Sequence, residues 1–127
     1  MDIQELIEVS GAKMGFVSVD DNPHMDDMPC GSKHYLVTLK VGKVSRNFYF
    51  SMGPAHTAGP TLTDVLSCLI SDYVGVENSS GFEDWAAEYG YSADNRKAFK
   101  TFKAVKRNSK KVVELFPSVD LLEVEGN

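Results

Sequence analysis

The chain has little cysteine and no long apolar run, and these two absences exclude several protein classes. Its 127 residues contain two cysteines, Cys30 and Cys68, without the CxxC spacing of metal or redox motifs, so we do not expect a disulfide framework. No apolar stretch approaches the ~18–20 residues of a membrane-spanning helix. The acidic start, residues 1–5, does not resemble a secretory signal. We therefore expect one cytosolic domain over residues 1–127, with two free thiols.

Motifs of catalysis and phosphate binding are also missing. Gly53 and Gly59 each precede a proline and no GK[ST] sequence follows them, so a phosphate-binding loop is not predicted. Cys68 follows the apolar spacing of a helix, where we expect a small buried side chain rather than a nucleophile. The sequence thus predicts no catalytic residue and no cofactor, and we expect a protein that is not an enzyme.

The segment over residues 20–34 is the main candidate for metal binding. His24, Cys30 and His34 lie within eleven residues, but their His-x5-Cys-x3-His spacing matches no standard zinc finger or knuckle. Four aspartates in the same segment indicate a solvated loop, so no metal is predicted. A structural zinc, a weak divalent-cation site on the aspartates and a metal-assisted hydrolase stay open as alternatives.

Charge is distributed unevenly along the chain. Eight of the thirteen Lys and Arg residues lie within residues 96–111, which contain no Asp or Glu. The remainder holds five basic and eighteen acidic residues, a net charge of −13, and no basic residue occurs from 47 to 95. The formal net charge of −5 therefore hides a basic element on an acidic body. This pattern favours the recognition of a charged partner.

Hydrophobic periodicity predicts an α+β domain. Two β-rich runs around a glycine turn predict an antiparallel hairpin over residues 34–50, and alternation over 14–19 predicts a further strand. A short helix is expected over residues 2–9. Capping residues with an acidic residue three positions later predict helix starts at Thr61 and Ser80. We expect a small antiparallel sheet of about three strands packed by about three helices.

The last helix is predicted to start at Ser92 and to end at Pro117, and it is amphipathic. Its basic side chains occupy about half of a helical wheel, and its large apolar side chains occupy the other half. The basic half is consistent with nucleic-acid binding, with a solvated face that pairs with the acidic body of the same chain or of a second copy, or with an acidic protein partner. The candidate contact residues are Arg96, Lys100, Lys103, Arg107 and Lys110.

The acidic residues provide a second candidate surface. Carboxylates in a loop and at helix starts can imitate phosphates and occupy the basic cleft of a nucleic-acid-binding protein. The simpler explanation is that acidic residues in a first helical turn stabilise the helix dipole. The candidate acidic contact residues are Asp20, Asp21, Asp26, Asp27, Glu83 and Asp84.

Five motifs carry a resemblance over residues 25–116. They are MDDMP (25–29), HYLVTL (34–39), FSMGPAHT (50–57), PTLTDVL (60–66) and FEDWAAEYGYSADNRKA (82–98). With these motifs the chain resembles a family of small phage and prophage proteins of unassigned function. Relatives tend to have Asp-Ser where this chain has Asp94-Asn95, and we expect Ser92 to cap the last helix despite this difference. Residues 1–24 lie outside the resemblance.

The resemblance implies a phage or prophage gene product that acts in a bacterial cytoplasm. Small acidic phage proteins without enzymatic activity are often inhibitors of host defence, as many anti-CRISPR proteins are. By this analogy the leading hypothesis is an inhibitor that binds a host defence nuclease or its complex through a charged surface. The alternative is a nucleic-acid-binding accessory protein of phage DNA metabolism that uses the basic helix.

Overall fold

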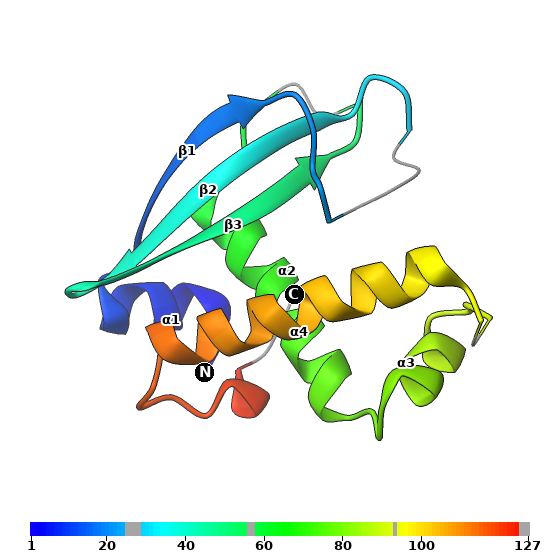
Figure 1. Ribbon diagram of the computed structural model, residues 1–127. Helices are drawn as coiled ribbons and strands as arrows, with labels where there is room; N and C mark the ends of the chain where they lie inside the picture. Colours follow the sequence, from blue (N-terminus) through cyan, green and yellow to red (C-terminus); the bar gives the residue numbers. More distant parts are fainter. Residues whose placement is uncertain (25–28, 56–57, 93, 125–127) are drawn as a thin grey trace.

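The computed structural model describes residues 1–24, 29–55, 58–92 and 94–124. These residues form a three-stranded sheet and four α-helices, followed by one turn of 3₁₀-helix (Figure 1). In chain order the elements are α1 (Ile3–Ser10), β1 (Lys13–Val19), β2 (Lys33–Val41), β3 (Val44–Met52), α2 (Leu62–Glu77), α3 (Phe82–Glu88), α4 (Arg96–Leu115) and η1 (Leu121–Glu123). The α+β fold predicted from the sequence is thus confirmed.

The sheet is an antiparallel meander in the order β1-β2-β3. Val41 pairs with Val44, which closes a two-residue turn in which Gly42 has a φ of 60°. Glycine adopts this left-handed conformation without the steric penalty that other residues incur. The hairpin expected over residues 34–50 is therefore present, and its register extends it by one to two residues at each end.

One face of the sheet forms the core. Tyr35, Val37 and Leu39 alternate along β2 and are buried, and Phe48 of β3 pairs with Val37 on the same face. Figure 1 shows α1, α2 and α4 on one side of the sheet. Helix α1 contributes Ile3 to this core, so the N-terminal segment packs with the rest of the described chain.

A second, smaller cluster joins α3 to α4. Trp85 and Ala86 of α3 are buried against Ala98 and Phe102 of α4. The indole ring of Trp85 lies 5.2 Å from the ring of Phe102, measured between centroids. This contact fixes α3 beside the N-terminal half of α4.

Two predicted helix starts are wrong. The α3 helix begins after Gly81, which provides no side-chain cap, and Asp84 instead accepts a hydrogen bond from the backbone N–H of Ser80 (3.0 Å). The α4 helix begins after Asn95, whose Oδ1 accepts from the N–H of Ala98 (3.0 Å). The hydroxyl of Ser92 donates to the carboxylate of Asp94 and does not cap the helix.

The remaining element boundaries differ less from the predictions. Thr61 caps α2 as expected, because its Oγ1 accepts a hydrogen bond from the N–H of Asp64 (3.1 Å). That helix continues to Glu77. After Pro117 the chain forms the single 3₁₀ turn η1.

Candidate functional site

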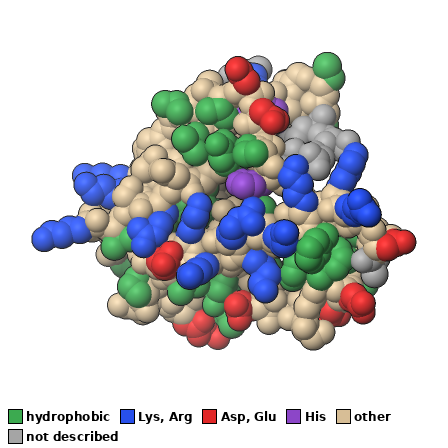
Figure 2. All heavy atoms as spheres, in the orientation of Figure 1, with side chains coloured by type: hydrophobic (Ala, Val, Ile, Leu, Met, Phe, Trp, Pro, Cys, Tyr) green, Lys and Arg blue, Asp and Glu red, His purple; other side chains and the backbone are tan. Residues whose placement is uncertain are grey.

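The exposed side of α4 is a continuous basic surface. Phe102, Val105 and Val112 bury the opposite side of the helix against the core. In Figure 2 the Lys and Arg side chains form a row across the molecule along α4. We call this surface the basic face, and it consists of Arg96, Lys97, Lys100, Lys103, Lys106, Arg107, Lys110 and Lys111.

All five predicted basic contact residues lie on this face and are exposed. The Nζ of Lys103 lies 5.1 Å from the ring centre of Phe99, and 45% of Phe99 is exposed. Nη2 of Arg107 lies 3.3 Å from Nδ1 of His24, so the guanidinium donates toward the imidazole. The basic face therefore includes an aromatic ring and borders a histidine.

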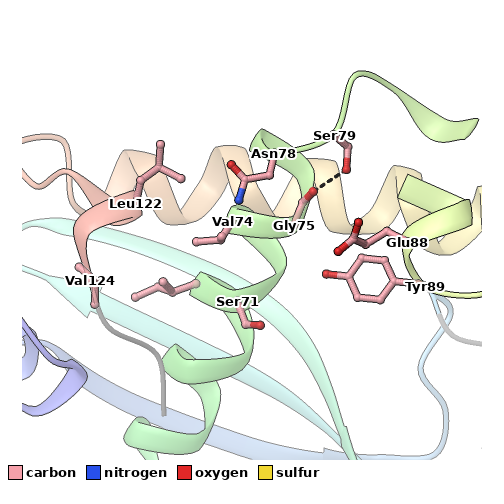
Figure 3. A pocket seen from close by; sticks show the side chains of 10 residues that line it. Ser71, Val74, Gly75, Asn78, Ser79, Glu88, Tyr89, Leu122 and Val124 are labelled. Atoms are coloured by element: carbon pink, nitrogen blue, oxygen red, sulfur yellow. Dashed lines mark hydrogen bonds between the residues drawn. The ribbon is translucent and has the colours of Figure 1, made fainter. Parts of the chain in front are cut away.

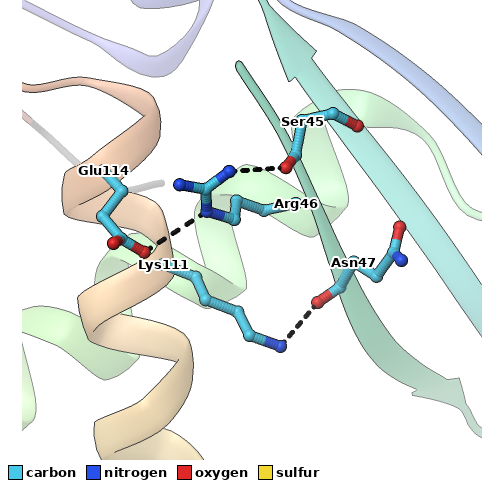
Figure 4. A network of polar contacts seen from close by, with 5 residues as sticks. All are labelled: Ser45, Arg46, Asn47, Lys111 and Glu114. Atoms are coloured by element: carbon cyan, nitrogen blue, oxygen red, sulfur yellow. Dashed lines mark hydrogen bonds and ion pairs between the residues drawn. The ribbon is translucent and has the colours of Figure 1, made fainter.

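The C-terminal half of α4 is tied to the edge of the sheet (Figure 4). Nε of Arg46 donates to Oε1 of Glu114 at 3.3 Å, and Nζ of Lys111 donates to the carbonyl oxygen of Asn47 at 2.9 Å. The ammonium group of Lys111 therefore helps to hold α4 against β3. In contrast, Lys103 and Lys110 form no salt bridge with any residue that the structure describes. No carboxylate of the described residues therefore pairs directly with Lys103 or Lys110.

The predicted acidic residues lie on separate elements. Asp20 and Asp21 are exposed directly after β1, whereas Glu83 and Asp84 lie in the first turn of α3. The hydrogen bond from Ser80 to Asp84 agrees with the simpler explanation, in which these acids stabilise a helix start. The other two candidates, Asp26 and Asp27, lie outside the described residues.

The candidate metal ligands have other partners. Nδ1 of His34 lies 2.8 Å from Oγ of Ser51, and that hydroxyl also accepts from Nδ2 of the buried Asn22 (3.0 Å). His24 packs edge-on against Tyr49 at 5.4 Å between ring centroids. Across the described ranges no group of three His, Cys, Asp or Glu side chains is arranged to hold a metal ion. The geometry provides no support for the metal-assisted hydrolase.

A cleft that was not predicted from the sequence lies beside the basic face. It has a volume of about 330 Å³ and is enclosed by α2, α3, α4, β3 and the connection after β1. Its sequence signal is a stripe of small and polar residues on α4 at helical spacing, between the apolar and basic sides. The polar and aromatic lining includes Tyr49, Asp72, Trp85, Tyr89, Thr101 and Asn108.

Two titratable side chains of α2, Asp72 and Cys68, line the cleft, and Asp72 is the acidic one. Burial raises the pKa of Asp72 to about 6, and no described residue donates a hydrogen bond to its carboxylate. Cys68, one turn earlier, is exposed and also lines the cleft, so the predicted buried position of this thiol is wrong. Partial burial, followed by the carboxylates of Asp72 and Asp64, raises the pKa of the Cys68 thiol.

A second hollow of about 370 Å³ lies between α2, α3 and η1 (Figure 3). Tyr89 lines both hollows and separates them. A Cβ atom placed on Gly75 would overlap the hydroxyl oxygen of Tyr89, so the tyrosine packs directly against the bare backbone of α2. The wall between the two hollows therefore depends on a glycine at this position.

Comparison with known proteins assigns no function to the chain. No family model, curated protein or solved structure shows significant similarity to the chain. The helices of the described part are all too short or too polar to span a membrane. We therefore infer function from the basic face and the cleft.

Proposed function

We propose that the chain is a non-enzymatic binding protein that holds nucleic acid along the basic face of α4. The observation that carries the proposal is a row of Lys and Arg side chains on one side of a helix whose other side is docked in the core. Lys103 and Lys110 have no acidic partner among the described residues. Their charges are available to phosphates.

The dimensions of the helix suit a strand of several nucleotides. Twenty residues at ~1.5 Å each extend over ~30 Å, enough for several consecutive phosphates. The half-exposed ring of Phe99 lies among the cations, where a base can stack on it. Because the rest of the chain is acidic, we expect contact to be confined to this face rather than to wrap around the molecule.

The sequence resemblance supports a setting for this activity. We propose that the protein acts in the cytoplasm of a bacterium that carries the phage or prophage. The accessory role in phage DNA metabolism is thus the function that the geometry supports best. The sequence alone favours this role less than the inhibitor.

The inhibitor of a host defence nuclease complex is the second candidate. The exposed carboxylates of Asp20 and Asp21 favour it, because no described residue pairs with them and they are available to a basic protein surface. A pull-down from host lysate tests this candidate with charge reversals at both positions. Loss of a captured nuclease in the reversed variant supports it, and unchanged capture excludes this loop as the contact surface.

The test of nucleic-acid binding compares two sets of substitutions with equal change in charge. In one variant Lys103, Arg107 and Lys110 become Gln, and in the matched control Lys13, Lys40 and Lys43, all outside α4, become Gln. Fluorescence anisotropy with a 20-nucleotide single strand is measured at ~50 and ~200 mM salt. We expect the α4 variant to lose about tenfold in affinity or more and to lower the slope of log affinity against log salt by about 2.

The control set distinguishes a site from general electrostatics. We expect its affinity to stay within about twofold of the unchanged protein, since its lysines lie at the sheet. Equal losses in both variants would show that net charge alone governs binding. No binding at ~50 mM salt would overturn the proposal. Sedimentation of the free protein in the same buffers shows whether the basic face instead joins two copies.

A further inference from the structure

The cleft and the basic face are adjacent, although their charges are opposite. His24 lines the cleft, and Nη2 of Arg107 on the basic face lies 3.3 Å from its Nδ1. Burial, and then the positive charges of Arg107, Lys111 and Lys100, lower the pKa of His24. The rim of the cleft is therefore cationic, whereas its interior holds the carboxylate of Asp72.

The walls of the cleft are aromatic and accessible. Tyr89 and Tyr91 are 48% and 44% exposed, and both pack on Trp85, which is itself only 4% exposed. Tyr49 contributes a further ring from β3. Exposed aromatic rings held by a buried one provide fixed surfaces on which a planar ligand can stack.

The interior of the cleft offers few and specific polar groups. Asp72 accepts hydrogen bonds when ionised and has no donor among the described residues, while Thr101 and Asn108 of α4 add a hydroxyl and an amide. A volume of about 330 Å³ lies at the lower end of the ~300–1,000 Å³ of small-molecule sites, which suits one base rather than several.

These features disfavour simpler ligands. The Lys and Arg residues at the rim repel a free organic cation, and Asp72 repels a free phosphate from the interior. A nucleotide complements both regions. Its anionic phosphate can pair with the cations at the rim, and its planar base carries N–H donors for the carboxylate in the interior. We propose that one unpaired guanine of a bound strand enters the cleft, with its Watson–Crick edge on Asp72 and its neighbouring phosphate on Arg107. This inference rests on the proposed function.

The preference for guanine follows from the carboxylate. The edge of guanine presents two adjacent donors, N1–H and N2–H, which match the two oxygens of an ionised carboxylate. In adenine and cytosine a lone-pair acceptor adjoins the amino group, and in uracil and thymine two carbonyl oxygens flank the single N–H. Each of these bases places a lone pair against an oxygen of Asp72.

The experiment uses two readouts on the full chain. Anisotropy of labelled 12-nucleotide strands measures binding of the strand, with a thymine strand compared to one that carries a single central guanine. Fluorescence of Trp85, the only tryptophan of the chain, measures occupancy of the cleft with unlabelled strands. The variants are Asp72→Asn and, as a matched control, Glu88→Gln, which lines the hollow on the other side of Tyr89.

We expect the guanine strand to bind about tenfold more tightly than the thymine strand and to change the fluorescence of Trp85. Asp72→Asn should abolish this preference and leave thymine binding within about twofold, whereas Glu88→Gln should change neither. Equal binding of both strands to the unchanged protein would overturn the guanine site and leave the basic face in place. Absence of binding by any strand at ~50 mM salt would overturn both proposals.

Discussion

At the scale of single residues, Asp72 shows how the cleft departs from an ordinary core. A carboxylate that has no donor partner among the described residues loses solvation without compensation, which raises its pKa to about 6. Among the described residues, the other titratable groups that line the cleft are His24 from the connection after β1, Cys68 from α2, Tyr49 from β3, and Tyr89 and Tyr91 at and after the end of α3. None of the groups on α4 that line the cleft is titratable.

Removing this charge should stabilise the protein at neutral pH. The folded protein holds the Asp72 proton more tightly than the unfolded chain, whose ordinary pKa is 3.8, so the stability from this group is full below pH ~4 and falls as pH rises through about 6. We expect Asp72→Asn to raise the free energy of unfolding by about 1–2 kcal/mol at pH 8 and to have little effect near pH 4. Urea unfolding at both pH values measures the difference.

A substitution at an exposed acid provides the control for this prediction. Glu8→Gln on α1 should change the free energy of unfolding by less than about 0.5 kcal/mol at either pH. A loss of stability in Asp72→Asn at pH 8 would contradict the argument, because it would mean that the carboxylate has a compensating partner in the folded protein.

At the scale of elements, the structures that were predicted correctly are those determined by neighbouring residues in the sequence. The alternation in β2 and β3 and the glycine turn between them depend on neighbouring residues, so the hairpin was predictable. The start of α4 was not, because Ser92 and Asn95 are both good capping residues and the choice depends on the competing bond from Ser92 to Asp94.

The capping bond of Asn95 should therefore matter and the hydroxyl of Ser92 should not. We expect Asn95→Ala to lower the free energy of unfolding by about 1 kcal/mol, since the N–H of Ala98 loses its acceptor. Ser92→Ala should lower it by less than about 0.3 kcal/mol, because this residue provides no cap. Thermal unfolding of the two variants ranks them directly, and the reverse ranking would restore Ser92 as the cap.

The candidate site was only half predictable from the sequence. The basic face follows from the spacing within one helix, and all five predicted residues lie on it. The stripe of small and polar residues on α4 indicates one wall of the cleft, but the meeting of four elements and a connection is not contained in any local pattern. The exposed position of Cys68 was predictable. On a helical wheel of 3.6 residues per turn, this residue lies about 60° outside the stripe of apolar residues between Val65 and Tyr73.

At the scale of the whole molecule, the basic face has opposite effects on stability and on binding. Lys103 has Lys106 and Arg107 as neighbours three and four positions later, and such like-charge pairs repel. The same concentration of charge attracts phosphates. Salt should therefore strengthen the fold while it weakens the complex.

This opposition gives a prediction for the free protein. Raising NaCl from ~10 to ~300 mM should increase the free energy of unfolding by about 1 kcal/mol, because the repulsion within α4 is screened. The Gln variant at Lys103, Arg107 and Lys110 should show less than half of this increase. Urea unfolding at the two salt concentrations measures both proteins, and a decrease with salt would show that attractive pairs dominate the surface.

The contact between Gly75 and Tyr89 has an evolutionary consequence. Since the phenol hydroxyl occupies the space of a side chain on α2, the two positions constrain each other's substitutions. A lineage that keeps the tyrosine must keep the glycine, and a lineage that acquires alanine at position 75 must shorten or reorient residue 89. We expect the two positions to covary among natural relatives, which would make this pair a sequence marker for the wall between the two hollows.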